Sequence, residues 1–140
     1  RLKLRAGEVG EDLAFLQLLF DWLTRSQAGW DQFFHDWKGG EASAARAAAS
    51  PQAALYQGDG FLVVRRGLGA RTRDDLGALQ SLPYLQRPQP VSMVIDEVER
   101  VWAAIAERDD WAAFDAKLGG VADMREALGL SRHRSVAGGA

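Results

Sequence analysis

The stretch GEDLAFLQLLFDWLTRS, residues 10–26, carries the strongest structural pattern in the chain. Its apolar residues recur at helical spacing, and Glu11 and Asp12 place negative charge in the first turn, where the helix dipole favours it. On a helical wheel the large apolar side chains occupy two faces, one formed by Leu13, Leu16, Phe20 and Leu23 and the other by Phe15, Leu18, Leu19 and Trp22. A helix that is apolar all round has to be covered on both sides. We therefore expect a central helix wrapped by the others, or a helix with one face docked on a partner.

Composition places the chain among globular proteins and narrows its partners. Of the 140 residues, 47% are hydrophobic and 26% are charged, which is ordinary for one compact domain. A formal net charge of −2 lacks the basic excess typical of nucleic-acid binding, so we expect no nucleic-acid partner. No apolar run reaches the ~20 residues that span a bilayer, so we expect no membrane partner. The absence of cysteine excludes disulfides and thiolate ligands, and is compatible with a cytoplasmic location.

The stretch WDQFFHDWKGG, residues 30–40, places a histidine and an aspartate among four aromatic rings. The rings of Trp30, Phe33, Phe34 and Trp37 follow the i, i+3, i+4, i+7 spacing of one apolar stripe. His35 and Asp36 then lie on the far side of the wheel and diverge by about 100°, so they are poorly placed to share a proton. We interpret this stretch as a short helix with a solvated His35–Asp36 face, closed by Gly39–Gly40. The alternative is a catalytic pair, with histidine titrating near neutrality.

Short helical segments separated by glycine and proline follow. The alanine-rich run 42–50 favours a helix, and a further helix is expected to begin at Pro51 and to end at Gly58. We assign the FLVV run, 61–64, to a helix because the chain offers no second strand to pair with it. The glycine pairs that flank it, Gly58/Gly60 and Gly67/Gly69, lack the lysine and hydroxyl sequel of a phosphate loop. They are interpreted as loop positions.

Two amphipathic helices are predicted after a proline-rich connector at 81–91. The first is expected to start at Ser92 and to bear an apolar stripe of Val94, Val98, Val101, Trp102 and Ile105. Its acidic cluster of Asp96, Glu97 and Glu99 is compatible with a metal site, but a solvated helix face is the simpler interpretation. The second helix is expected to be capped by Asp109, to bear a stripe of Trp111, Phe114 and Leu118, and to end at Gly119–Gly120.

Together these patterns predict an all-α fold, with six to eight mostly short helices in a compact single domain over residues 1–130. The segment 131–140 is expected to be a flexible C-terminal tail. We identify no catalytic, cofactor-binding or metal-binding residue in the sequence. An active site in this chain would require His35, Asp96 and Glu99 to converge, which we regard as the weakest of the three functional hypotheses.

The N-terminal part resembles a segment of the selenoprotein O (YdiU) family. In that family a K-L-G-L stretch precedes an acidic helix start, a leucine-rich helix and a short D-(F/Y)-x-x-F-F helix. Here KLRAGEVGEDLAFLQLLFDWL and then WDQFF follow the same order, and residues 43–56 and 90–111 are similar to some bacterial members. The resemblance implies a parent enzyme with a protein-kinase-like fold that transfers AMP from ATP to protein hydroxyl groups, using metal ions. It implies no catalytic residue in this chain, because the nucleotide- and metal-binding motifs lie upstream of the matched segment.

Two main functional hypotheses follow for the chain. In the first it is the C-terminal helical segment of such an enzyme, a fragment of a longer chain that packs against the missing kinase-like core. ATP and Mg²⁺ would then belong to the parent protein. A chain that starts at Arg1 without an initiator methionine is expected under this hypothesis. In the second it is a self-contained helical module that binds a protein partner, or forms a homodimer through exposed apolar surface.

Overall fold

The computed structural model describes residues 1–130, so the predicted flexible tail, 131–140, lies outside the described residues. Residues 1–130 contain helices and no strand, which confirms the predicted all-α class. The α-helices are α1 (Val9–Ser26), α2 (Trp30–Asp36), α3 (Ala44–Ala48), α4 (Asp59–Ala70), α5 (Gly77–Gln80), α6 (Ile95–Arg108) and α7 (Ala112–Leu128). Three short 3-10 helices are interspersed, η1 (Gly40–Ser43), η2 (Ala53–Gln57) and η3 (Pro83–Gln86).

These helices form two compact units. The first comprises Arg1–Ser92 and the second begins at Met93. None of the helices in residues 1–130 combines the length and the hydrophobicity that crossing a membrane requires.

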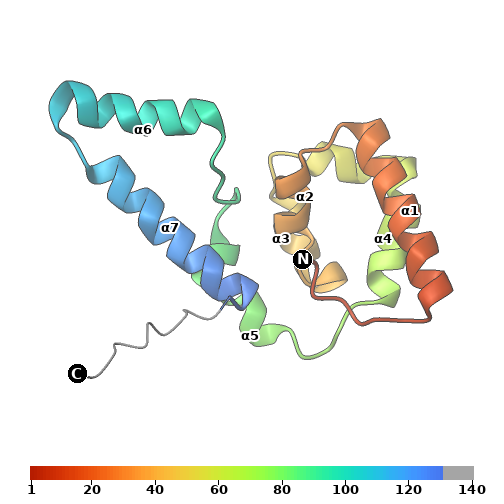
Figure 1. The fold of residues 1–140 in the computed structure, drawn as a ribbon. Coiled ribbons are helices and arrows are strands. Elements are labelled where there is room, and N and C mark those ends of the chain that lie inside the picture. The colour runs from red at the N-terminus through yellow and green to blue at the C-terminus, as the bar shows by residue number, and fades with distance from the viewer. Residues whose placement is uncertain (131–140) are drawn as a thin grey trace. The chain divides into compact units, whose positions relative to one another are not determined.

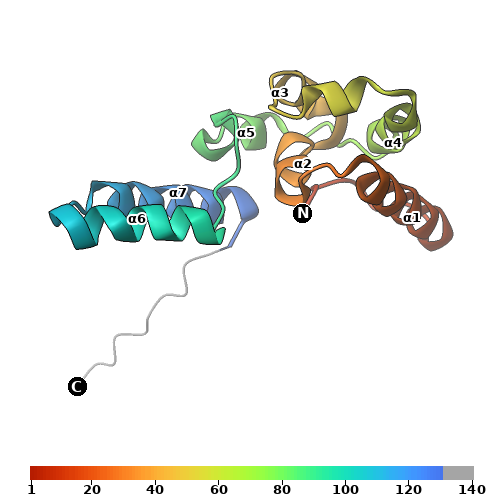
Figure 2. The same ribbon diagram turned by 90° about the horizontal axis from the view of Figure 1, so that it is seen from above.

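Helix α1 begins and ends within one residue of its predicted limits. Glu11 and Asp12 lie in its first turn, and Gln27 takes the left-handed conformation that ends it. Its buried residues are Phe15, Leu19, Trp22 and Leu23. In both views α1 lies beside α4, so this buried face of α1 contributes to the core of the first unit (Figures 1 and 2).

The other apolar face of α1 is exposed at every position except Leu23, which corrects the expectation of a central helix covered on both sides. Leu13 is 62% exposed, and Leu16 and Phe20 are 40% and 41% exposed. The first unit is too small to place helices on both sides of α1: α4 packs against one side only. Of the two possibilities that the pattern left open, a helix with one uncovered apolar face is the one observed.

An aromatic cluster forms the core of the first unit. Phe61 of α4 is fully buried and its ring contacts those of Trp22 and Trp37, with centroids 4.8 Å and 5.0 Å away. Tyr56 and Phe33 complete the cluster at 5.1 Å and 6.5 Å from the Phe61 ring. The tilted and edge-on ring geometries are those that aromatic pairs prefer. Helices α1, α2 and α4 and η2 therefore meet at Phe61.

Helix α4 confirms the helical assignment of FLVV and corrects the interpretation of Gly67/Gly69 as loop positions. Both glycines lie within α4. A Cβ atom on Gly67 would lie 2.4 Å from Cδ2 of Phe15, so the missing side chain lets α1 approach α4 closely. Beside this contact the guanidinium of Arg71 lies 4.7 Å from the centre of the Phe15 ring and donates to the Asp12 carboxylate at 2.9 Å. Gly67 is thus a helix-packing position.

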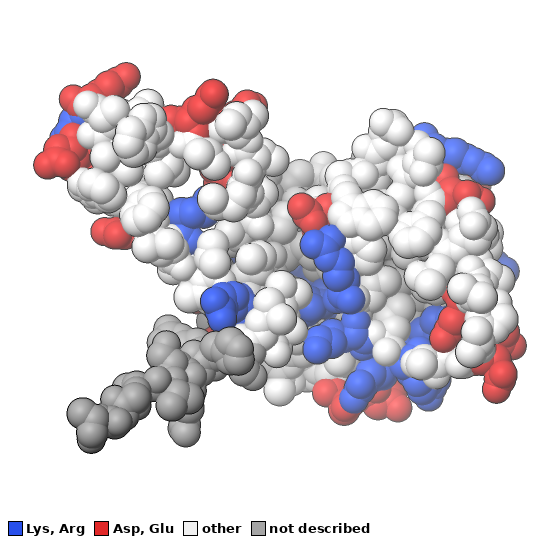
Figure 3. Space-filling model, viewed as in Figure 1, with Lys and Arg blue, Asp and Glu red and all other residues white. Residues whose placement is uncertain are grey.

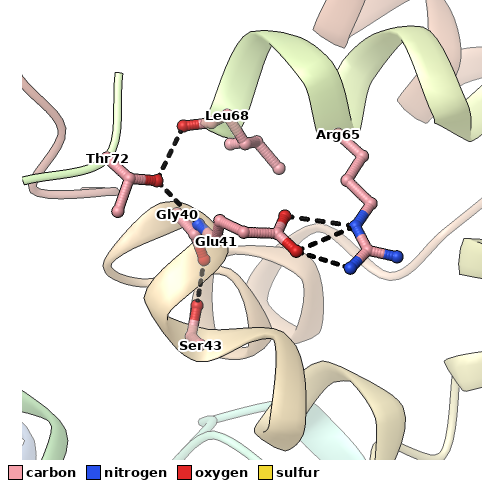
Figure 4. Close-up of polar contacts among 6 residues, drawn as sticks. All are labelled: Gly40, Glu41, Ser43, Arg65, Leu68 and Thr72. Carbon is pink, nitrogen blue, oxygen red and sulfur yellow. Dashed lines mark hydrogen bonds and ion pairs between the residues drawn. The ribbon is translucent and has the colours of Figure 1, made fainter. Parts of the chain in front are cut away.

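A second junction joins η1 to α4 (Figure 4). The backbone N–H of Glu41 donates to the Thr72 hydroxyl at 2.8 Å, and that hydroxyl donates to the Leu68 carbonyl at 2.9 Å. Arg65 donates from Nε to both carboxylate oxygens of Glu41 at 3.1 Å. Gly40 has φ +63°, and a Cβ there would lie 2.5 Å from the Thr72 hydroxyl oxygen. Glycine is therefore required at the start of η1 for both conformation and space.

Three predicted helix ends in the second half of the chain are wrong. Helix α6 starts at Ile95, after Val94, and not at Ser92. Asp109 ends α6 in the left-handed conformation, with φ 51°, while the Asp110 carboxylate accepts the Ala112 N–H at 3.0 Å and so satisfies the start of α7. Helix α7 continues through Gly119–Gly120 to Leu128. Glycine weakens a helix interior by only about 1 kcal/mol per residue, which flanking turns of helix can offset.

The second unit is a helical hairpin. Helices α6 and α7 run in opposite directions from the turn at 109–111 and diverge from it (Figures 1 and 2). An ion pair between Lys117 of α7 and Glu97 of α6 joins them. The buried residues of these two helices are all small: Ala104, Gly120 and Ala127. The large apolar side chains of the hairpin are therefore mostly outside any core.

The Gly67 contact predicts opposite effects for two alanine substitutions in α4. Gly67→Ala should lower the free energy of unfolding by about 1–2 kcal/mol, because its methyl group overlaps the Phe15 ring. Gly69→Ala, with nothing within 4 Å of the added Cβ, should raise it by about 0.5 kcal/mol through helix propensity. Urea unfolding followed by circular dichroism measures both. Equal effects of the two substitutions would contradict the close approach of α1 and α4.

Candidate functional site

His35 and Asp36 are buried, which overturns their predicted place on a solvated helix face. His35 is 3% exposed and Asp36 is 0% exposed. The helical wheel placed them opposite the aromatic stripe, but α2 is enclosed on that side as well. There it meets polar groups of Ser50, Tyr56 and the Arg87 backbone. The far side of α2 is thus the site of a buried polar network.

The Asp36 carboxylate is the centre of this network. Oδ2 accepts hydrogen bonds from the Ser50 hydroxyl at 2.5 Å and the Tyr56 hydroxyl at 2.7 Å, and Oδ1 accepts one from the Gln32 amide at 2.8 Å. Gln32 also donates to the Pro88 carbonyl at 3.0 Å. Burial, followed by the hydrogen bond to Asp36, raises the pKa of the Tyr56 hydroxyl, so Tyr56 stays protonated and donates. Three donors satisfy a carboxylate that no solvent reaches.

His35 makes its contacts away from Asp36. Its Nε2 lies 2.9 Å from the Arg87 carbonyl oxygen, and its ring packs edge-on against Tyr84 with centroids 5.0 Å apart. Because a carbonyl only accepts, Nε2 carries the proton in this contact. Burial lowers the pKa of the imidazole, and Nδ1 is buried without a hydrogen-bond partner among residues 1–130, both of which favour the neutral ring. His35 and Asp36 thus have different partners, in agreement with the prediction that they do not share a proton.

Two cations lie near the C-terminal end of α2, and one of them, Arg46, binds its carbonyls. Arg46 donates to the carbonyls of His35 at 3.0 Å and Lys38 at 2.8 Å, and to the Gln80 side chain at 2.7 Å. Cations are favourable at a helix C-terminus, where carbonyls lack partners within the helix. Lys38 is 2% exposed and its ammonium donates to the Arg1 carbonyl at 3.1 Å. Burial lowers the pKa of Lys38 to about 8, and the positive charges of nearby side chains add to this effect.

This network holds the fold together and has little scope for chemistry. Its carboxylate is saturated by donors, its histidine is held by a backbone carbonyl, and its lysine is closed to solvent. A general acid or base has to reach the atom whose proton it transfers, and these groups lie beneath the surface. The catalytic alternative for His35–Asp36 therefore gains no geometric support.

The network was not foreseen from the sequence. Ser50 and Tyr56 lie 14 and 20 residues from Asp36 in the chain, and Arg87 lies 52 residues from His35. No local spacing connects such residues. The one usable signal was the Gly39–Gly40 pair, since both glycines have positive φ directly after α2.

The acidic cluster predicted on α6 is largely solvated. Asp96 and Glu99 are exposed, and Glu97 forms its ion pair with Lys117. Within residues 1–130 no group of three or more histidine, cysteine, aspartate or glutamate side chains is arranged to hold a metal ion. His35, the third member of the proposed catalytic set, is enclosed in the first unit.

One open depression of about 510 Å³ lies at the surface of the first unit. Its lining residues are Leu4, Arg5, Ala6, Arg73, Asp74 and Asp75. Arg73 is engaged by the Asp75 carboxylate, and Arg5 donates to the Ala70 carbonyl at 3.3 Å. Both of its arginines thus have partners within the chain, and we assign the depression no function.

The exposed stripe of α1 is the more prominent surface of the first unit. We call it the α1 surface and define it by Val9, Leu13, Leu16, Phe20 and the neighbouring Trp30 of α2. Trp30 is 47% exposed and stacks on Phe20 with ring centroids 5.5 Å apart and planes tilted by 16°. Contiguous exposed apolar residues of this kind usually mark an interaction site. This surface is the best candidate functional site of the first unit.

Comparisons with protein-family models, curated proteins and solved structures find no match for this chain.

The Asp36 network predicts very different costs for two aspartates of α2. Asp36→Ala should lower the free energy of unfolding by about 3 kcal/mol or more, because it leaves the buried hydroxyls of Ser50 and Tyr56 without their acceptor. Asp31→Ala should change it by less than about 0.5 kcal/mol, because Asp31 pairs with Arg1 at the surface. Chemical unfolding of both variants tests this. A small effect at Asp36 would contradict the buried network.

Lys38 predicts that stability rises with pH in a defined window. The folded-state pKa of about 8 lies below the ordinary value of 10.5, so between these pH values the unfolded chain binds a proton that the folded chain lacks. Stability should therefore increase from pH 8 towards pH 10. Above pH 10 the raised pKa of Tyr56 acts in the opposite direction, because the unfolded tyrosine loses its proton first.

Lys38→Met isolates this contribution. The variant should be more stable than the wild type by about 1–2 kcal/mol at pH 7, since it removes a buried charge, and the advantage should shrink as the pH approaches 10. Urea titrations of both proteins at pH 7, 8, 9 and 9.8 give the difference. A constant difference across this range would mean that Lys38 has an ordinary pKa.

Proposed function

We propose that this chain is the non-catalytic helical C-terminal portion of a protein adenylyltransferase of the selenoprotein O type, and that the α1 surface packs against the kinase-like core of that enzyme. The parent enzyme transfers AMP from ATP to hydroxyl groups of target proteins. In this proposal the chain supports the core and acts on no substrate itself. It operates in the cytoplasm, in keeping with a sequence that contains no cysteine.

The α1 surface is the observation that carries this proposal. The segment that resembles the family comprises α1 and α2, and these two helices supply all of the exposed apolar residues of that surface. Complete burial of a large apolar side chain stabilises a protein by about 1.5–3 kcal/mol. This free energy is not fully gained at Leu13, Leu16, Phe20 and Trp30, which remain exposed. A permanent neighbour in the same protein would recover this free energy. A core preceding α1 in the chain is well placed to be that neighbour.

Residues 1–130 do not fit a Mg²⁺ site of their own. Magnesium in nucleotide sites is held by carboxylates together with the phosphates, and residues 1–130 present no suitable cluster. We therefore assign Mg²⁺, together with ATP, to the proposed core.

A self-contained interaction module is the second candidate, and the aromatic core favours it. The cluster around Phe61 buries residues from four helical elements of the first unit. A unit with such a core can fold without help from a neighbour. In this case the α1 surface binds a separate protein or a second copy of the chain.

The open reading frame and a pair of matched variants test the first proposal. We expect the reading frame to encode a kinase-type lysine and an Asp-Phe-Gly-type motif upstream of Arg1. In the protein made from it, Leu16→Ser combined with Phe20→Ser should lower AMP transfer from radiolabelled ATP by about tenfold or more, because it weakens docking. Leu62→Ser combined with Val63→Ser on α4, which are similarly exposed, should leave the transfer within about twofold.

The start of the open reading frame also distinguishes between the two candidate functions. A reading frame that begins near Arg1 would end the first proposal and leave the interaction module. Calorimetry on the 140-residue chain with ATP and Mg²⁺ should show no binding heat, and a saturable signal would reveal a site of its own.

A further inference from the structure

The hairpin of the second unit bears a second apolar surface, separate from the α1 surface. On α6, Val98 and Trp102 are 40% and 65% exposed, and on α7, Phe114 and Leu118 are 37% and 52% exposed. The spacing of four residues within each pair places its two members on one stripe of their helix. We call these four residues the hairpin surface. The buried residues of both helices are alanines and a glycine, so the hairpin gains little from its own packing.

The two stripes face the same side of the hairpin. Glu97 and Lys117 form the ion pair that marks the facing sides of α6 and α7. Val98 and Leu118 each directly follow one of these residues, so each is turned from the ion pair by about 100° in the same rotational sense. In antiparallel helices equal rotations of this kind turn both side chains to the same side. The hairpin surface is therefore an apolar strip to which both helices contribute.

The charges around this strip are predominantly acidic. The described residues of the hairpin, 93–130, contain nine acidic and four basic side chains. Glu99 of α6 and Asp115 of α7 are exposed beside the strip, and Lys117 and Arg108 are engaged by Glu97 and Glu107. Arg125 is the basic exception: it is exposed on the same face of α7, two turns beyond Leu118. Figure 3 shows acidic side chains grouped over α6 and its end at the turn. An occupant of the strip therefore meets negative charge along its edges.

We propose that the hairpin surface binds a basic amphipathic helix of a protein partner. The apolar stripe of such a helix would cover Trp102 and Leu118, and its flanking lysine or arginine side chains would lie against Glu99 and Asp115. Helices that bind in grooves use this combination of a hydrophobic stripe and a complementary charged rim. The inference concerns the second unit alone and does not depend on what covers α1.

The same charges argue against the two other occupants of an exposed helical face. A second copy of the hairpin would bring two acidic rims together, which disfavours association. A membrane surface would require the opposite charge, because anionic lipids attract lysine and arginine and repel carboxylates. A basic protein helix is the occupant that satisfies both the apolar strip and its rim.

A pair of synthetic helices tests the proposal on the full chain. One peptide of about 18 residues carries leucines at i, i+3, i+4 and i+7 with lysines on the flanks, and its counterpart has glutamate in place of each lysine. Fluorescence anisotropy should show saturable binding of the basic peptide and at least about tenfold weaker binding of the acidic one. Equal binding of the two peptides would overturn the proposal.

Matched variants locate the binding site. Glu99→Lys should weaken binding of the basic peptide about fivefold or more, whereas Glu107→Lys, which lies about 180° around α6 from Val98, should leave it within about twofold. Trp102→Ser combined with Leu118→Ser should abolish binding, and Leu16→Ser combined with Phe20→Ser on the α1 surface should not. Circular dichroism of each variant is the control for loss of helical structure. Equal effects of Glu99→Lys and Glu107→Lys would mean that the peptide responds only to the net charge of the protein, and would overturn the proposal.

Analytical ultracentrifugation of the chain without peptide tests whether a second copy of the chain occupies the hairpin surface. We expect Trp102→Ser combined with Leu118→Ser to leave the association state unchanged. A dimer that this variant dissociates would assign the hairpin surface to a second copy and overturn the proposal. Failure of α1 docking in the AMP-transfer experiment leaves this result unaffected, so the two proposals stand or fall separately.

Discussion

The close approach of α1 and α4 is the constraint on which the rest of the first unit depends. It exists because Gly67 leaves room for the Phe15 ring, and the Arg71–Asp12 ion pair holds the adjoining turn. With the two helices in contact, Trp22 and Phe61 meet, and α2 and η2 can close over them. The same approach covers one face of α1, and the other face is covered only in part, by the Trp30 ring of α2 on Phe20. The α1 surface is thus a consequence of how the core is built.

Helix α2 shows how a short helix can be buried on two sides with quite different chemistry. One side inserts Phe33 and Trp37 into the aromatic core, and the other inserts Asp36 and His35 into a polar network. Burying a carboxylate is tolerable only when donors surround it, and Ser50, Tyr56 and Gln32 do so. The network thereby ties α2 to η2, and fixes the chain as firmly as the apolar contacts do.

The sequence allowed prediction of the helical class and of α1, because a long periodic pattern outweighs local exceptions. It failed for His35 and Asp36, since a helical wheel shows which side is polar but not which side is covered, and the covering residues are distant in the chain. It also failed for Gly67, whose role is set by Phe15 on another helix, and for Gly119–Gly120, which a continuing helix absorbs. The wrong predictions share one cause, which is a tertiary contact that the local sequence pattern does not show. The exposed faces on both units are likewise visible only once the packing is known.

The placement of the tryptophans gives the protein built-in optical reporters. Trp22 and Trp37 are 9% and 2% exposed in the core, whereas Trp30, Trp102 and Trp111 are 47%, 65% and 48% exposed. A water-soluble quencher therefore reaches three of the five indoles and spares the other two. Emission from the shielded pair follows the integrity of the aromatic core. Quenching of the three accessible indoles should fall when a partner covers the α1 surface or the hairpin. The same fluorescence measurement can therefore distinguish unfolding of the core from binding of a partner.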